Sequence, residues 1–150
     1  MTGVEAAIDR LEQIAPLTTL VNDRIYNSVA PQGCASPFVV VRNVSDMRDH
    51  HLRGLDDLGL TRVQVDAYVD EASGADAKGQ ANAVAQAIFG DGNGPTATGL
   101  CGWIGAVGGS PATGRVSGVF YAGRFEGVEF DERRRWYVRQ DFMVHWKALS

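Results

Sequence analysis

The sequence has few of the residues that build metal, redox or membrane sites. It contains two cysteines, Cys34 and Cys101, at no metal-binding or redox spacing, and only three histidines. Two such thiols in an acidic chain favour a reduced, cytosolic state. Residues 1–5 have neither a basic segment nor an apolar run, so we expect no secretory signal. No stretch approaches the roughly 20 apolar residues of a membrane helix, so we expect no membrane partner.

The sequence also lacks an excess of basic residues. Its 18 acidic and 14 basic residues give a net charge of −4, which argues against a general nucleic-acid-binding protein, because such proteins need a basic face. The 150 residues are 45% hydrophobic and 21% charged, which is close to the globular average. These values predict one domain over residues 1–150, without internal repeats.

Apolar spacing predicts two main helices. The first begins with a capping box of Thr2 and Glu5 and carries one apolar stripe, Val4, Ile8, Leu11 and Ala15. The second begins with a capping box of Ser73 and Asp76 and ends at Gly90. Its stripe is mostly alanine, so we expect this helix to lie close against a sheet: Ala77, Ala81, Val84, Ala85 and Ile88.

Five segments have the composition of strands: 24–29, 38–45, 60–70, 116–130 and 136–146. The third alternates strictly, which predicts a half-buried strand with Val63, Val65, Ala67 and Val69 on its buried face and Arg62, Gln64, Asp66 and Tyr68 on the other. The last places one mainly apolar set on a single face: Trp136, Val138, Phe142, Val144 and Trp146.

The order of these elements predicts an α+β fold. Strands joined by short polar links favour antiparallel pairing, with the helices on one face. We therefore expect a two-layer sandwich of two main helices on a mostly antiparallel sheet of four to five strands, with the other face partly open.

Two segments are predicted to project from this domain as loops. Residues 46–59 are polar and charged, which favours an exposed loop or a long hairpin arm. Residues 90–114 hold nine glycines and are too long for a plain turn. We expect this second segment to be mobile in the free subunit, and Trp103 and Ile104 to become buried only against a partner. The alternative is that both residues anchor a static loop on their own domain.

No motif in the chain carries catalytic or metal-binding chemistry with the context it needs. His50 and His51 are neighbours and point apart, without a further ligand at metal spacing, so a solvated surface is the better interpretation. Residues 109–114 have the glycine spacing of a phosphate-binding loop, but Arg115 and Val116 stand where Lys and Ser or Thr are required. No catalytic triad, Cys/His pair or carboxylate pair can be assembled.

A run of charges lies between the last two predicted strands. Glu126, Glu129, Asp131 and Glu132 precede Arg133, Arg134 and Arg135. Such a run usually marks a solvated hairpin tip with weak ion pairs. In an oligomeric ring, an equally good interpretation is that acidic residues of one subunit meet the arginines of the next.

One region resembles a known family. A short helix ends near Asn22, an extended segment follows at 24–26, a Pro-Gln-Gly turn lies at 31–33, and a strand opens with the Pro-Phe-Val-Val of residues 37–40. This order near the N-terminus is similar to that of the tail-completion proteins of tailed bacteriophages, which belong with the tail terminators. The resemblance is sharpest over residues 17–45, with further similarity at 60–69 and in the terminal strand.

The resemblance implies a structural virion protein without enzymatic activity or cofactor. It implies assembly in the host cytoplasm into a hexameric ring that caps the tail tube and meets the neck or head-completion protein, with DNA passing through the lumen. An acidic balance suits a passage that does not grip DNA. For such a ring, our candidate contact residues are Arg48, His50, His51, Arg53, Trp103, Ile104, Arg133, Arg134 and Arg135.

Two alternatives remain open on the sequence. The first is a head–tail adaptor or stopper of the neck, which differs from a terminator only in its position in the particle. The second is a small bacterial α+β enzyme or ligand-binding domain, which would require a concave pocket with convergent polar groups.

Overall fold

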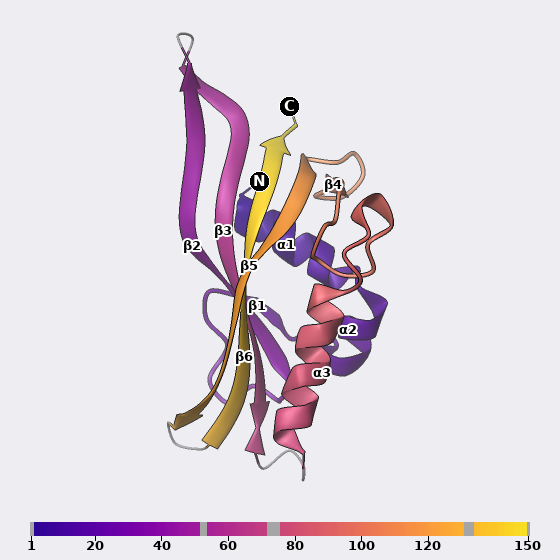
Figure 1. The fold of residues 1–150 in the computed structure, drawn as a ribbon, viewed down its shortest axis with the longest axis vertical. Coiled ribbons are helices and arrows are strands. Elements are labelled where there is room, and N and C mark those ends of the chain that lie inside the picture. The colour runs from indigo at the N-terminus through magenta and orange to yellow at the C-terminus, as the bar shows by residue number, and fades with distance from the viewer. Residues whose placement is uncertain (1, 52–53, 72–75, 131–133, 150) are drawn as a thin grey trace.

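A six-stranded sheet carries helices on one of its faces (Figure 1). The computed structural model describes residues 2–51, 54–71, 76–130 and 134–149. The elements in chain order are α1 (Gly3–Glu12), α2 (Ala15–Val21), β1 (Ile25–Asn27), β2 (Phe38–His51), β3 (Gly54–Asp70), α3 (Ala77–Phe89), the 3-10 helix η2 (Gly94–Thr96), β4 (Gly105–Val107), β5 (Gly114–Phe130) and β6 (Arg134–Ala148). The α+β class is therefore confirmed.

The sheet is larger and more mixed than the sequence predicts. Its strand order is β1-β2-β3-β6-β5-β4, and β1 runs parallel to β2 while all other neighbours are antiparallel. The expectation of four to five strands is wrong because β4 is only three residues long and lies inside the glycine-rich segment. The short helix that the sequence predicts to end near Asn22 is the α-helix α2, which carries Pro16 in its first turn.

The helices begin and end largely where their capping residues predict. Thr2 and Glu5 form the reciprocal capping box of α1, with the Glu5 backbone N–H donating to Thr2 Oγ1 at 3.1 Å. The helix α3 is capped by Asp76 rather than by Ser73, which lies outside the described residues. The Asp76 carboxylate accepts from the Gly79 backbone N–H at 3.0 Å. The predicted alanine-rich stripe of α3 is buried, as expected.

The main core lies between the helices and one face of the sheet. It joins apolar residues of α1, α2 and α3 to the inward-facing residues of β2, β3 and β6, including Val39, Val63, Phe142, Val144 and Trp146. The indole Nε1 of Trp146 donates to Thr61 Oγ1 at 2.8 Å, and Thr61 donates to Asp46 at 2.6 Å. The most deeply buried indole of the core is thus hydrogen-bonded.

Residues 46–59 continue β2 and β3, which agrees with the long hairpin arm and not with the exposed loop of the two predicted alternatives; residues 52–53 lie outside the described residues. Met47 pairs with Leu60 and Arg48 with Gly59 across the two strands. The described side chains of residues 43–47 are all exposed, and the ends of both strands extend beyond the helices (Figure 1). Because the described side chains of residues 43–47 are not covered, this part of β2 lacks the apolar alternation by which a strand is recognised.

Residues 90–114 pack on their own domain, so the expectation of a segment ordered only by a partner is wrong. The Leu100 backbone N–H donates to Ile88 O at 2.7 Å, and Leu100 is buried. The guanidinium of Arg10 donates to Ala97 O at 2.8 Å and to Gly99 O at 3.2 Å. A side chain at Gly90 would meet the Gly99 backbone at 2.2 Å. Glycine here permits close backbone packing, and sequence reasoning took it as a sign of mobility.

Candidate functional site

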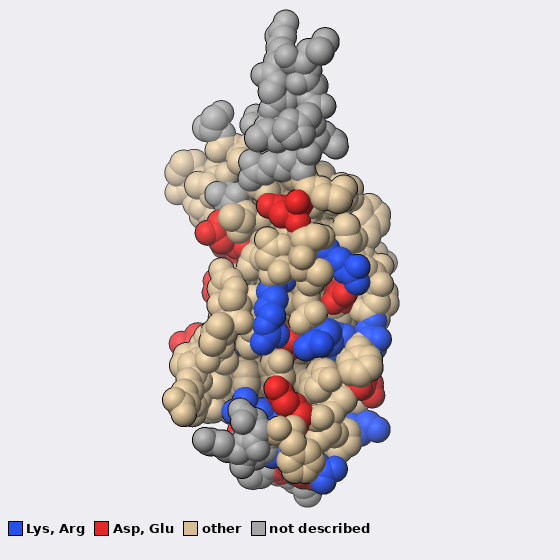
Figure 2. Space-filling view, turned by 90° about the vertical axis from the view of Figure 1, so that its left-hand side faces the viewer, with Lys and Arg blue, Asp and Glu red and all other residues tan. Residues whose placement is uncertain are grey.

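The sheet face turned away from the helices carries a network of charged residues. We call this face the open face. Alternation along β3 and β6 directs their apolar residues toward the helices and the intervening polar residues to the open face. The charged ladder of this face comprises Arg42, Arg62, Asp66, Asp70, Arg135, Arg139 and Asp141. Figure 2 shows Lys and Arg over the middle and lower half of this side, with Asp and Glu between them.

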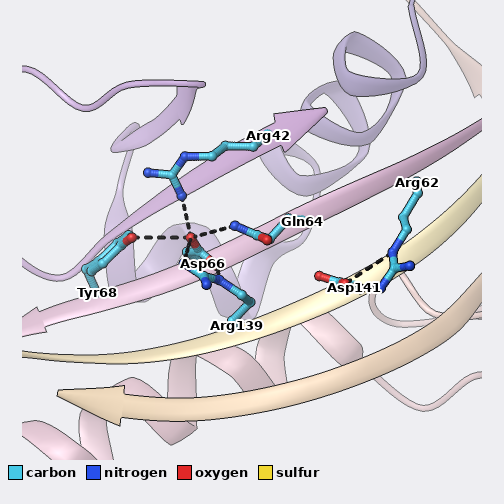
Figure 3. Close-up of polar contacts among 7 residues, drawn as sticks. All are labelled: Arg42, Arg62, Gln64, Asp66, Tyr68, Arg139 and Asp141. Atoms are coloured by element: carbon cyan, nitrogen blue, oxygen red, sulfur yellow. Dashed lines mark hydrogen bonds and ion pairs between the residues drawn. The ribbon is translucent and has the colours of Figure 1, made fainter. Parts of the chain in front are cut away.

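Asp66 is the centre of the ladder and is fully buried (Figure 3). Arg42 of β2 donates to its Oδ2 atom. Arg139 of β6 donates from Nε to Oδ1 at 2.9 Å and from Nη2 to Oδ2 at 3.2 Å. Gln64 and Tyr68 each add a hydrogen bond to Oδ2 at 3.2 Å. A buried carboxylate needs such compensation, because an unpaired charge away from water is costly.

The electrostatics of this centre fit a structural ion pair. The hydrogen bond to Asp66 is the largest cause that raises the pKa of Arg139 above its usual value. Burial, followed by the nearby charge of Asp66, raises the pKa of the Tyr68 hydroxyl. Both groups therefore keep their ordinary protonation near neutral pH. Four donor side chains bind the Asp66 carboxylate, one through Oδ1 and all four through Oδ2, so this group is held as an ion-pair partner within the fold.

A second ion pair, Arg62 with Asp141, lies beside the first (Figure 3). Arg62 donates from Nη2 to Asp141 Oδ2 at 2.6 Å. The other carboxylate oxygen, Oδ1, is buried and has no hydrogen-bond partner among the described residues. A cavity of about 140 Å³ lies against Asp141 and is also lined by Gly123, Arg124, Phe125 and Arg139. The cavity is too small for a typical organic ligand, since ligand pockets span about 300–1,000 Å³.

Aromatic rings cross the sheet along one row at the lower part of the open face. Phe38 and Tyr68 stack with centroids 5.1 Å apart, Tyr68 and Tyr137 lie 6.0 Å apart, and Tyr137 and Phe125 also lie 6.0 Å apart. Tyr26 of β1 continues the row beside Phe38. Interacting rings at these distances stabilise cross-strand pairs. The row therefore adds rigidity to five neighbouring strands.

The charged ladder contains four arginines and three aspartates and is largely neutralised by its own ion pairs. No group of three or more potential metal ligands occurs among the described residues. No helix of the described chain is long and apolar enough to cross a membrane.

The sequence-predicted contact residues do not come together in one place. Arg48, His50 and His51 belong to the far end of β2. Arg53 and Arg133 lie outside the described residues. The interface role of this arm stays a prediction.

Trp103 is buried in its own domain and is not available to a partner. Its side chain is 6% exposed within the main core, and the Arg10 guanidinium lies 4.8 Å from the centroid of its ring. Ile104 is half-buried. The structure thus has the internal anchor that the sequence left as the alternative interpretation.

Among the described residues, the arginines at the start of β6 form ion pairs with acidic residues at and just after the end of β3, and none with Glu126 or Glu129 of β5. Arg134 lies 3.3 Å from Glu71, and Arg135 lies 2.8 Å from Asp70. Arg134 also packs over the rings of Phe130 and Trp136. The reason is the strand order, because β6 lies between β5 and β3, and Asp70 of β3 is directly opposite Arg135.

The sequence analysis places Asp66 on the polar face of its strand but does not predict its network with Arg42 and Arg139. The available signal was a lone Asp in the middle of a strand with arginines at alternate positions of two other strands. Using that signal requires the pairing of β3 with β6, which places Asp66 directly opposite Arg139. Strand order in the sheet is not readable from the alternation of a single strand.

Comparison with known proteins gives a family match and a structural match. The family model described as "Tail completion protein gp17" matches residues 5–98, more than half of the chain. A solved structure described as "Virion of native gene transfer agent (GTA) particle" contains a chain with the same fold. The TM-score is 0.60 at 19% sequence identity, covering 95% of this chain and 92% of that chain. No curated protein sequence matches this chain.

Proposed function

Because the chain belongs to the tail completion family of tailed bacteriophages, we propose that it forms a ring at the head-proximal end of the tail and joins the tail to the neck. The family places the chain among the structural proteins of the virion tail. A six-fold ring is the arrangement that we propose, with the tail tube protein on one side and the neck or head-completion protein on the other. The family match over residues 5–98 is the observation that carries this proposal.

The shape of the subunit supports a ring component. The hairpin arm formed by the ends of β2 and β3 extends beyond the helices (Figure 1). The exposed side chains of residues 43–47 make no hydrophobic core of their own. A long ribbon without cover gains stability when a neighbouring subunit packs against it. We therefore place the arm, including Arg48, His50, His51 and Arg53, at a contact with a neighbouring subunit or with the neck.

The charge of the subunit supports passage of DNA without binding. The net charge is −4, and the arginines of the charged ladder are held by carboxylates. Tight binding of DNA requires cations that are free to neutralise phosphates. On this proposal, a lumen formed by such subunits lets DNA move through.

The test is to mix the purified protein with tail tubes that lack their terminal ring and to examine them by electron microscopy. We expect added density at one end of each tube. Unchanged tubes would exclude the proposed function. Density on isolated heads or necks instead of tubes would point to the adaptor or stopper.

Charge reversal tests the arm within the same experiment. Replacing Arg48 and Arg53 by Glu should leave the free energy of unfolding within about 1 kcal/mol, as is usual for surface positions, while the ring fails to form on tubes. A matched control is Arg115→Glu with Lys147→Glu, two exposed basic residues that face each other across β5 and β6. The control should assemble normally. Normal assembly of the arm variant would exclude this role of the arm.

A further inference from the structure

Two strands of the sheet have long edges without a partner strand. β1 pairs with β2 only through residues 39–41, and β4 pairs with β5 only through residues 114–116. Beyond β4, the Gly102 backbone N–H covers one more position of β5 by donating to Val119 O at 2.8 Å. Residues 43–51 of β2 and 122–130 of β5 are therefore outer edges with no neighbouring strand among the described residues. Unpaired edges are templates for pairing with another chain.

The two free edges lie on opposite sides of the sheet and toward opposite ends. Arg42, Gln64, Asp141 and Gly123 follow one another directly across β2, β3, β6 and β5. The free edge of β2 begins after Arg42 and extends toward one end of the sheet. The free edge of β5 runs from about Gly123 toward the other end. One line across the sheet thus separates the two free edges.

This diagonal offset suits a closed ring. Three antiparallel steps separate β2 from β5, so the two strands run in opposite directions. When a sheet continues from copy to copy around an axis, β2 of one copy therefore meets β5 of the next in antiparallel orientation. Closure of such a sheet requires tilted strands and a stagger between the first and last edges. Free edges at opposite ends of the sheet provide such a stagger.

Exposed apolar side chains lie on both free edges. Val44 and Met47 of β2 are 49% and 61% exposed, and Phe125 and Phe130 of β5 are 58% and 76% exposed. Charged or proline residues usually protect an edge strand that stays free. Both free edges carry charged residues as well, among them Arg48 and Glu126, and the large exposed apolar groups beside these charges favour burial against a second copy of this chain.

We propose that residues 44–51 of β2 in one copy pair antiparallel with residues 123–130 of β5 in the next copy, in the ring of the proposed function. Two conditions set this register. Residues directly opposite in an antiparallel pair share one face, and Ser45 and Glu129 both face the open side, opposite Arg62 and Arg135. Pairing Ser45 with Glu129 also overlaps the two free edges over almost their full length.

Disulfide trapping tests this register in the full-length protein assembled on tail tubes. The variant Ser45→Cys with Glu129→Cys places the two thiols directly opposite, with Cβ atoms about 5 Å apart. The matched control, Ser45→Cys with Phe125→Cys, keeps an exposed position on the same face but displaces it by about 14 Å along the strand. Under mild oxidation with diamide, we expect a ladder of covalent oligomers from the first variant. We expect at least tenfold less from the control and from the parent protein, which has only Cys34 and Cys101.

The outcomes separate this inference from the proposed function. Rings on tubes with no ladder from the first variant, or with equal ladders from both variants, would refute edge pairing and leave the ring proposal standing. Absence of rings from the parent protein would remove both. A second trapping pair in the same register is Arg48→Cys with Glu126→Cys, whose positions share the helix side of the sheet because they lie opposite Gly59 and Val138. It serves if thermal unfolding shows that the first pair disturbs the fold.

Discussion

The substitution Trp103→Ala tests whether this side chain anchors the glycine-rich segment, residues 90–114, to the core of its own subunit. Trp103 joins residues 90–114 to the main core, where its side chain is 6% exposed. Arg10 packs over its ring at 4.8 Å, and burial lowers the pKa of that guanidinium. The same guanidinium donates to the carbonyl oxygens of Ala97 and Gly99. The substitution therefore removes both an apolar anchor and the surface on which the Arg10 clamp rests.

The expected magnitude follows from the area that the indole buries. A buried aromatic side chain removes about 150–250 Å² from water, and at about 25 cal/mol per Å² this amounts to roughly 4–6 kcal/mol. Alanine keeps a small part of that area, and Trp→Ala changes in cores cost about 3–5 kcal/mol. The cation–π contact adds about 1 kcal/mol for a partly desolvated pair. We expect the free energy of unfolding to fall by about 4 kcal/mol and the Tm by about 10 °C for a chain of this length.

Urea denaturation of the isolated subunit, followed by circular dichroism, measures this change. Phe120→Ala is the matched control, because Phe120 is an aromatic residue that is 59% exposed. The control should change the free energy of unfolding by less than about 1 kcal/mol. A loss below 1 kcal/mol for Trp103→Ala, together with failed assembly on tubes, would refute the reasoning. That result would mean that the indole serves a partner and not its own core.

Two further predictions concern buried and exposed carboxylates. Asp66→Asn should lower the free energy of unfolding by about 2 kcal/mol. Loss of a buried ion-pair partner costs about 3–5 kcal/mol, but the side chains of Arg42 and Arg139 are about one-third exposed, so water can solvate them in the variant. A urea midpoint equal to that of the parent would contradict the structural role of Asp66. The hydrogen bond from the Thr98 backbone N–H is the largest cause that lowers the pKa of Asp91. The ionised Asp91 carboxylate therefore stabilises the fold at neutral pH, and this stabilisation is lost as the pH falls through the lowered pKa. Asp91→Asn should therefore narrow the difference in Tm between pH 7 and about pH 3, and an unchanged difference would contradict this.

The parts of the fold that the sequence predicts are those with one covered face. The apolar alternation of β3 and β6 and the alanine-rich stripe of α3 correspond to buried positions. The two irregularities of β5 lie next to Gly118 and Gly123, and glycine within a strand favours such bulges. In each case one face of the element packs in the core and the other faces solvent or charged residues, so apolar and polar residues repeat with the period of a strand or a helix.

The parts that the sequence does not predict depend on contacts between distant segments. The ladder around Asp66 requires the pairing of three strands, and the packing of residues 90–114 requires Arg10 from α1. The short strands β1 and β4 have three residues each, too few for a period. The sequence leaves the extension of β2 open between a loop and a hairpin arm, because the described side chains of residues 43–47 are all exposed and carry no apolar alternation.

The open face and the free edges together direct how copies of this chain can associate. The charged ladder places ion pairs over one side of the sheet, and partly buried charges resist further desolvation by a second sheet stacked on that face. The free edges of β2 and β5 have exposed apolar side chains and no neighbouring strand among the described residues. Association through the edges is therefore favoured over stacking of faces. Two different edges that meet only in one orientation produce a heterologous contact, which closes into a ring when the rotation between copies is a fraction of a full turn. A ring subunit needs this combination, because stacking through the faces would compete with closure.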